Sequence, residues 1–149
     1  MALDRDTLNQ FVDTVRRYVR DRLIPLEMQV AEEDRIPEDV IDEMKDMGLF
    51  GLSIPEEFGG LGLTMSEEVA VIQEMGYTSP AFRSMFGTNV GIGSQGIVID
   101  GTPEQKAQYL PLMASGELVG SFALTEPDAG SDAGSVATTA RRDGDHYII

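Results

Sequence analysis

Residues 121–132 combine residue types and spacing suited to holding a large ligand with an anionic part. They read Ser-Phe-Ala-Leu-Thr-Glu-Pro-Asp-Ala-Gly-Ser-Asp, and an apolar, strand-like run at residues 118–124 ends within them. Backbone amides at such a strand end, together with the Thr125 hydroxyl, can hydrogen-bond the polar edge of a ring. Gly130 lies among small residues, and successive N–H groups in a glycine-containing turn can form an anion-binding nest. The spacing alone suits a ligand-binding strand end and an ordinary strand-to-loop turn equally well.

A longer pattern separates these two interpretations. Residues 124–132, Leu-Thr-Glu-Pro-Asp-Ala-Gly-Ser-Asp, follow an aromatic residue, Phe122, two places earlier. This gap-free run closely resembles the flavin-binding signature of the acyl-CoA dehydrogenase family, with Asp128 at a position that is often glycine. The resemblance extends through nearly all of the chain, including Ile-Pro-Glu-Glu-Phe-Gly-Gly-Leu-Gly at 54–62 and Gly-Thr-Pro-Glu-Gln-Lys at 101–106.

The resemblance implies a mainly α fold. Residues 1–117 would form an N-terminal helical-bundle domain of the acyl-CoA dehydrogenase type, and residues 118–149 would form the first strands of a truncated β-barrel domain. Members of the family continue into a C-terminal helical bundle and usually assemble as homotetramers. FAD lies between the β domain and the C-terminal helices, partly against a neighbouring subunit.

The resemblance also assigns site residues. Six of them would contact FAD: Phe122, Ala123, Leu124, Thr125, Gly130 and Ser131. The Thr125 hydroxyl would donate a hydrogen bond to the pyrimidine edge of the isoalloxazine ring, where electron density builds up on reduction. Gly130 and Ser131 would face the FAD diphosphate or the pantetheine arm of CoA, and Ser131 is the expected substrate contact. The family's catalytic glutamate lies in the C-terminal bundle, so no catalytic residue is expected in this chain.

The implied function of the parent protein is FAD-dependent α,β-dehydrogenation of an acyl-CoA to trans-2-enoyl-CoA, a reaction of fatty acid metabolism. Electrons would pass to an electron-transfer flavoprotein. A related flavin-dependent oxidase or monooxygenase is the first alternative, since the signature does not separate these classes. A non-catalytic helical interaction module is the second. The preferred acyl chain is not encoded in these motifs.

Composition and charge exclude several other classes. The chain has 149 residues, a formal net charge of −15 and no cysteine, so it can form neither a disulfide nor a cysteine-based metal site. The negative field opposes nucleic acid, which needs clustered basic residues, and CoA would need local positive charge or backbone amides. Arg141 and Arg142, the adjacent basic pair near the signature, suit either a ligand contact or a solvated strand end. With neither a secretory pattern nor a membrane span of about 18 apolar residues, the sequence predicts a cytoplasmic protein.

Periodicity predicts about five helices ahead of the signature. An apolar stripe from Leu8 to Leu23 predicts an amphipathic helix that Pro25 kinks and that could resume through Val30. Pro37 is predicted at the first position of the next helix, which Gly48 ends as a left-handed cap. Residues 49–63 read as an apolar loop that either shelters a pocket or simply joins two helices, and the joining role is the one expected.

Later helices carry their own start signals. Thr64 and Glu67 form a capping-box pair, and Val69, Ile72 and Met75 are predicted to share the buried face of the helix that follows. Further helices begin at 79–80 and at 102–105, and Gly116 is predicted to end the last one. After it, residues 118–124 and 135–141 read as strands.

Asp143 and Gly144 predict a hairpin turn ahead of a final strand at residues 146–149. An unpaired apolar strand at a terminus favours aggregation. We therefore expect the chain to be a fragment of a longer protein whose β domain continues.

Residues 91–96 match the G-x-G-x-x-G spelling of a dinucleotide-binding turn, but a helix is predicted before them where that motif needs a strand. Four glycines at positions 87, 91, 93 and 96 instead leave room either for close approach of another helix or, by the resemblance, for a fatty acyl chain. His146 is the single histidine, with no serine partner nearby, and no carboxylate cluster has calcium-loop spacing. A metal site and a hydrolase triad are therefore not predicted.

Overall fold

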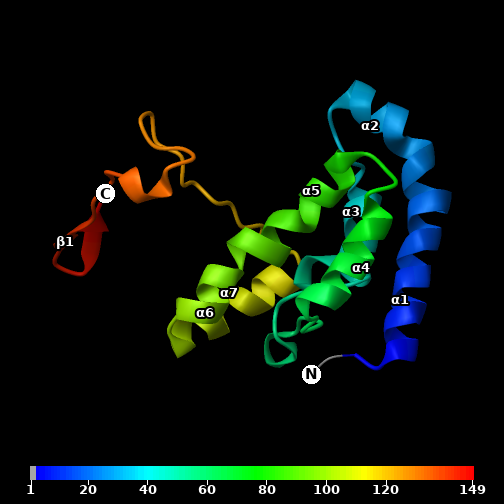
Figure 1. The fold of residues 1–149 in the computed structure, drawn as a ribbon, viewed down its shortest axis with the longest axis horizontal. Coiled ribbons are helices and arrows are strands. Elements are labelled where there is room, and N and C mark those ends of the chain that lie inside the picture. Colours follow the sequence, from blue (N-terminus) through cyan, green and yellow to red (C-terminus); the bar gives the residue numbers. More distant parts are fainter. Residues whose placement is uncertain (1–2) are drawn as a thin grey trace.

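The computed structural model describes residues 3–149. A helical body, which ends with the last helix at Ala114, is followed by an extended arm, residues 118–149 (Figure 1). The body contains helices α1 (Arg5–Tyr18), α2 (Glu27–Glu33), α3 (Glu38–Asp46), α4 (Met65–Met75), α5 (Pro80–Thr88), α6 (Gln95–Asp100) and α7 (Pro103–Ala114). The arm carries a single two-stranded hairpin, β1 (Arg141–Asp143) and β2 (His146–Ile148). The mainly α fold agrees with the sequence, whereas the division at residue 117 stays a prediction.

Helices α1 and α2 form one long kinked rod along the outside of the body (Figure 1). Between them lie a π-helical turn, Val19–Leu23, and a 3-10 turn, Ile24–Leu26. The Ile24 N–H reaches back five residues to the Val19 carbonyl. Pro25 explains this widening, because a proline has no N–H and its ring clashes with the carbonyl four residues earlier. The predicted kink, with the helix resuming through Val30, is confirmed.

The predicted helix ends are mostly confirmed. Thr64 with Glu67 and Thr102 with Gln105 form complete capping boxes. Gly48 and Gly116 follow α3 and α7 with φ of 73° and 76°, the left-handed conformation that glycine adopts without steric cost.

Pro37 lies one residue outside the position predicted for it. It is the N-cap of α3, with an extended ψ of 142°, and its carbonyl accepts hydrogen bonds from Val40 and Ile41. Helix α3 therefore begins at Glu38.

The buried face of α4 differs from the prediction. Val71 and Met75 are buried in the main core, while Val69 is 47% exposed. Successive helix residues are rotated by about 100°, so Val69 and Val71 cannot both face the core. The packing of α1 against α4 selects the stripe that contains Val71 (Figure 1).

Residues 49–63 are part of the core and do more than join two helices. Leu49, Phe50, Leu52 and Ile54 are fully buried. The segment satisfies its own backbone through two 3-10 turns, Leu49–Gly51 and Glu56–Phe58, and through cross-segment hydrogen bonds such as Leu63 N–H to Leu52 O at 2.8 Å. This self-pairing lets an irregular segment be buried without unpaired backbone groups.

The predicted strands of the arm are largely wrong. Residues 118–124 are extended but pair with no strand among the described residues, and of residues 135–141 only Arg141 lies in one. The predicted hairpin is confirmed, with Asp143 opposite His146 and Gly144 at φ 63°. A strand requires a hydrogen-bonded neighbour, and the described arm supplies one only within the hairpin.

Within residues 3–149, no helix combines the length and apolar character that crossing a bilayer requires.

Gly60 provides a test of the buried loop. A Cβ at this position would lie 2.0 Å from the Ile54 carbonyl oxygen and 2.7 Å from that of Gly51. Because backbone atoms cannot move aside easily, Gly60→Ala should lower the free energy of unfolding by about 3 kcal/mol or more. Urea unfolding followed by circular dichroism measures this change.

The matched control is Gly96→Ala, where an added Cβ meets nothing within 4 Å inside α6. This variant should keep its stability or gain up to about 1 kcal/mol from helix propensity. Equal stability of the two variants would contradict the packing described for residues 49–63.

Candidate functional site

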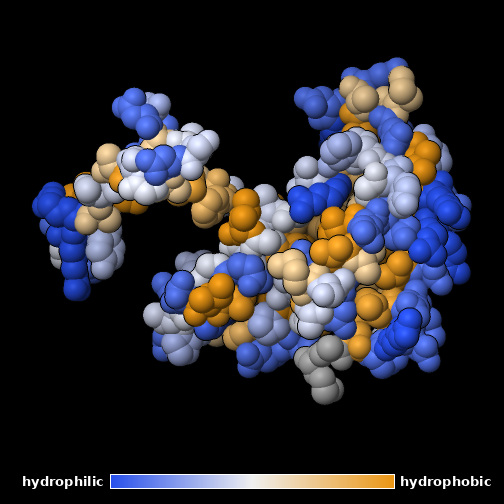
Figure 2. All heavy atoms as spheres, viewed as in Figure 1, coloured by the Kyte–Doolittle hydropathy of each residue, from blue (hydrophilic) through white to orange (hydrophobic). Residues whose placement is uncertain are grey.

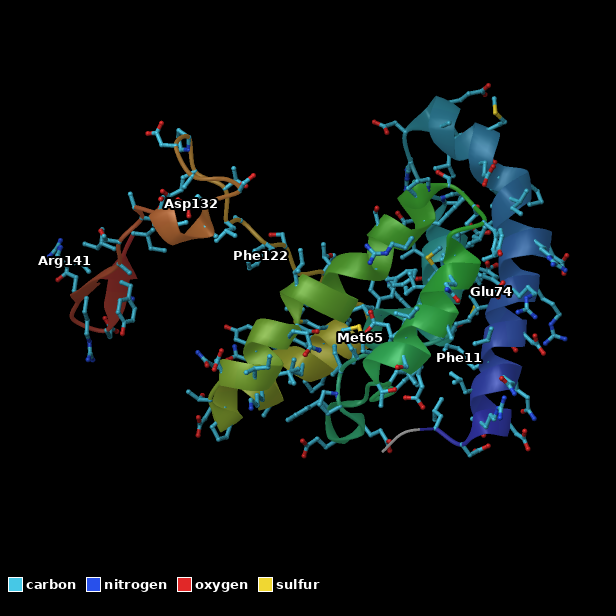
Figure 3. The ribbon with its side chains drawn as sticks, viewed as in Figure 1. Phe11, Met65, Glu74, Phe122, Asp132 and Arg141 are labelled. Atoms are coloured by element: carbon cyan, nitrogen blue, oxygen red, sulfur yellow. The ribbon has the colours of Figure 1, made fainter. Side chains whose placement is uncertain are left out.

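The candidate site is the extended segment 121–125, where the arm leaves the body. In Figure 3, Phe122 lies on this segment, far from Phe11 and Glu74 on the body. The side chains of Phe122 and Leu124 are 57% and 41% exposed. Apolar surface gathers where the arm departs (Figure 2). Leu118 and Val119, at the start of the arm, are exposed. The segment thus presents aromatic and aliphatic groups for contact.

The backbone of residues 121–125 forms no hydrogen bond with any other part of the described chain. Backbone N–H and C=O groups are strong hydrogen-bonding groups that seek partners when they are covered. A planar ligand with donors and acceptors along its rim could pair with this edge while one of its faces contacts Phe122 and Leu124, which lie on the same side of an extended chain. The segment therefore fits a flavin ring, although these contacts stay a prediction.

A tight turn follows the segment. The Glu126 N–H donates to the Ala129 carbonyl at 2.9 Å, and the Ala129 N–H donates to the Glu126 carbonyl at 3.3 Å. Ala129, the last residue of this turn, is buried. Proline at the second turn position is favoured because its φ is already fixed, which accounts for Pro127. The turn reverses the chain directly after Thr125.

Glu126 holds the loop that contains the turn, a role that the sequence did not reveal. Its two carboxylate oxygens accept hydrogen bonds from the amides of Ala137 and Thr138, each at 2.8 Å. A hydrogen bond from the Thr138 side chain, followed by these two amide bonds, lowers the pKa of Glu126 below its ordinary value. Residues 126–138 thus form a loop closed by a charged side chain.

The six predicted FAD residues fall in two groups. Phe122, Ala123, Leu124 and Thr125 lie on the extended segment, whereas Gly130 and Ser131 lie beyond the turn. Gly130 has open space around it, since a Cβ there would meet nothing within 4 Å. The Ser131 side chain is exposed. The chain brings the two groups near in sequence but does not enclose them in one pocket.

Asn89 is a second residue that sequence reasoning missed. It begins the π-helical turn Asn89–Gly93 after α5, and its side chain is fully buried. That side chain bonds the backbone of Met113, Leu118 and Gly120, on both sides of the point where the arm begins. An asparagine within a glycine-rich helical run was the only signal available.

A hollow of about 210 Å³ lies beside the same π-helical turn. Its lining residues come from the buried loop, α4, the turn and the start of α6: Ser53, Leu63, Met65, Glu68, Val90, Gly91 and Gln95. Partial burial raises the pKa of Glu68. Gly91 and Gly96 border open space, while Gly93 is crowded by the Thr88 carbonyl, which a Cβ would meet at 2.6 Å. Gly93 is therefore required by close packing, whereas Gly91 and Gly96 leave space that a side chain could fill.

The remaining candidates do not assemble into sites. Helix α5 precedes residues 91–96, so the strand that a dinucleotide-binding turn needs is replaced by a helix. The Arg142 guanidinium donates to the carbonyl of Gly144 in its own hairpin, and Arg141 is exposed at the far end of the arm (Figure 3). Among residues 3–149, no group of three His, Cys, Asp or Glu side chains is placed to hold a metal ion.

The closed loop should open at low pH. Because the folded-state pKa of Glu126 is depressed, its stabilisation is complete above the ordinary value of 4.5 and is lost as the pH falls through the lower folded-state value. Amide exchange protection of Ala137 and Thr138 should therefore fall across this acidic range. NMR exchange measurements at a series of pH values test this.

The Leu61 amide, which donates to the Gly51 backbone carbonyl at 2.9 Å, is the internal control and should keep its protection. At pH values above this acidic range, Glu126→Gln should lower the protection of Ala137 and Thr138 relative to the unaltered protein. Unchanged protection in that variant would contradict the loop closure.

Comparison with known proteins adds three findings. The family model for the acyl-CoA dehydrogenase N-terminal domain matches residues 5–117. A (2S)-methylsuccinyl-CoA dehydrogenase from Cereibacter sphaeroides is 38% identical over 149 residues, covering 99% of this chain and 27% of that protein. An acyl-CoA dehydrogenase from Bacillus subtilis is 36% identical over 135 residues, covering 91% of this chain and 36% of that protein. The chain thus spans about a third or less of the length of these relatives.

The structural likeness is equally extensive. The crystal structure of an acyl-CoA dehydrogenase complexed with FAD from Bacillus anthracis superposes with a TM-score of 0.83 at 32% identity, covering 99% of this chain and 26% of that one. The match includes the arm, so the extended course of residues 118–149 has a counterpart in a flavin-bound protein.

Proposed function

Because this chain belongs to the acyl-CoA dehydrogenase family, we propose that it forms the N-terminal part of an FAD-dependent enzyme that converts an acyl-CoA to trans-2-enoyl-CoA. The observation that carries the proposal is the extended segment 121–125, whose backbone edge is unpaired and whose side chains Phe122 and Leu124 are exposed. It stands directly before the loop that Glu126 closes. A relative of the same fold binds FAD.

Residues 122–125 contact the flavin ring in this proposal. Phe122 and Leu124 exclude water from one of its faces, Ala123 leaves room for close approach, and the Thr125 hydroxyl donates to the pyrimidine edge. A donor fixed at the point where negative charge develops stabilises the reduced state without reorganisation. Bound FAD supplies the acceptor for the hydride that leaves the β-carbon of the substrate.

Residues beyond the turn contact the anionic parts of the ligands. Gly130 allows the FAD diphosphate or the pantetheine arm to approach the backbone, and Ser131 hydrogen-bonds the substrate. Backbone amides supply this recognition without adding positive charge to a chain whose formal net charge is −15. The hollow beside Gly91 is the proposed position of the acyl chain.

The assembly around this chain is part of the same proposal. The carboxylate base that removes the α-proton lies outside residues 1–149, so the chain by itself does not turn over. The complete enzyme is a cytoplasmic homotetramer of fatty acid metabolism and reduces an electron-transfer flavoprotein. The family likeness supports the acyl-CoA dehydrogenation on which this proposal rests.

The activity is tested on the protein translated from the complete reading frame that contains residues 1–149. We expect a flavin spectrum that bleaches anaerobically when acyl-CoA is added, and slow re-oxidation by air. Rapid re-oxidation by oxygen would favour an oxidase or monooxygenase. Absence of flavin would leave the helical interaction module, and robust turnover by the 149-residue chain alone would contradict the position of the base.

Thr125→Ala tests the flavin contact in that protein. Loss of one neutral hydrogen bond is worth about 0.5–1.5 kcal/mol, so the dissociation constant of FAD should rise by about 2- to 12-fold. Thr139→Ala, a matched change in an exposed residue outside the signature, should leave it unchanged. Fluorescence titration of the apoprotein measures both, and equal affinities would contradict the assignment of Thr125.

A further inference from the structure

Asn89 is a polar side chain in the apolar interior, and all of its hydrogen-bonding groups face backbone. Its amide nitrogen donates to the Met113 carbonyl at 3.0 Å and to the Leu118 carbonyl at 2.8 Å. Its amide oxygen accepts from the Gly120 N–H at 2.7 Å. The residue is completely shielded from solvent.

These three bonds use both amide protons and the carbonyl oxygen. They join the π-helical turn after α5, the end of α7 and the first residues of the arm. The arrangement requires two donors and one acceptor on a short planar group. A carboxylate of the same shape could accept from Gly120 but could not donate to the two carbonyls, and an alanine would leave all three groups without this partner.

The backbone of the arm also lies close to the π-helical turn. A Cβ on Gly120 would be 3.4 Å from the Cα of Gly93 and 3.0 Å from the methyl carbon of Met113. Both glycines therefore permit a backbone-to-backbone contact directly beside Asn89. The sequence predicted that Gly93, with three neighbouring glycines, leaves room for another helix or for an acyl chain, and the structure places the arm beside Gly93.

Gly120 is the last residue before the extended segment 121–125 that forms a hydrogen bond with the body. From Ser121 to Thr125 the backbone forms none within the described chain, and the next bonds are those of the loop that Glu126 closes. Five extended residues span at most about 17 Å, so the position of Gly120 limits where Thr125 can lie.

We propose that Asn89 is a positioning residue for the flavin site, because it fixes Leu118 and Gly120 and thereby the start of the segment 121–125. The three hydrogen bonds show that Asn89 holds the start of the arm. That this affects flavin binding rests on the proposed function. Asn89 acts through the backbone of the arm and does not touch the cofactor.

The first measurement needs no cofactor. NMR amide exchange in the 149-residue chain compares Gly120 with a core amide such as that of Val15. In Asn89→Ala the protection factor of Gly120 should fall by at least about tenfold beyond any loss at Val15, because its buried acceptor is gone. The control Val71→Ala, a core truncation on α4, should lower both amides equally. Retained protection of Gly120 in Asn89→Ala would overturn the inference.

The second measurement is FAD affinity in the protein from the complete reading frame. Asn89→Ala should raise the dissociation constant at least about tenfold, while Val71→Ala should leave it unchanged. Asn89→Asp keeps the acceptor for Gly120 but places negative charge against two carbonyls. Its affinity should recover as the pH falls, because protonation of the new carboxyl restores one donor, whereas a purely structural defect gives no such pH dependence.

Gly120→Val displaces the arm while Asn89 stays intact. This variant replaces Asn89→Ala in the affinity measurement if Asn89→Ala does not fold. It should also weaken FAD binding. Unchanged affinity in both Gly120→Val and Asn89→Asp would overturn the positioning role even if the exchange result stands. Failure of the unaltered protein to bind FAD would instead refute the proposed function, and the exchange measurement would still decide whether Asn89 anchors the arm.

Discussion

Hydrogen-bond pairing of the backbone is the constraint on which this structure depends. The helical body satisfies it internally, through capped helices and through the self-paired loop at residues 49–63. Residues 121–125 do not satisfy it, although they carry exposed apolar side chains that favour being covered. An unpaired edge beside apolar side chains is suited to a planar ligand with a polar rim. This contrast within one chain supports the proposed flavin contacts, which the signature at residues 122–132 first indicated.

Two side chains border that unpaired edge, the buried Asn89 and the charged Glu126. Asn89 binds the backbone just before it, and Glu126 closes the loop just after it. Each uses one side chain to satisfy several backbone groups, so the segment between them stays extended without strand neighbours. The body thus contributes to the site by holding its ends, and the side chains between those ends remain available for contact.

Local features of the fold were predictable from the sequence. The capping pair Thr64 and Glu67, the kink at Pro25 and the left-handed Gly48 depend on residues within a few positions of one another. The exposure of Val69 and the burial of residues 49–63 were not predictable. Both depend on which surfaces meet in three dimensions, and residue periodicity over a few turns does not determine that.

The candidate site divides in the same way. The order of residues 122–131 indicated a ligand-binding segment, because the motif is contiguous. The residues that hold it were missed, because Asn89 bonds partners 24 to 31 positions away and Glu126 bonds partners 11 and 12 positions away. The most direct test of the flavin assignment is a crystal structure, with FAD bound, of the protein from the complete reading frame. The pyrimidine edge of the ring should lie about 3 Å from the Thr125 hydroxyl, and FAD bound away from residues 121–131 would contradict it.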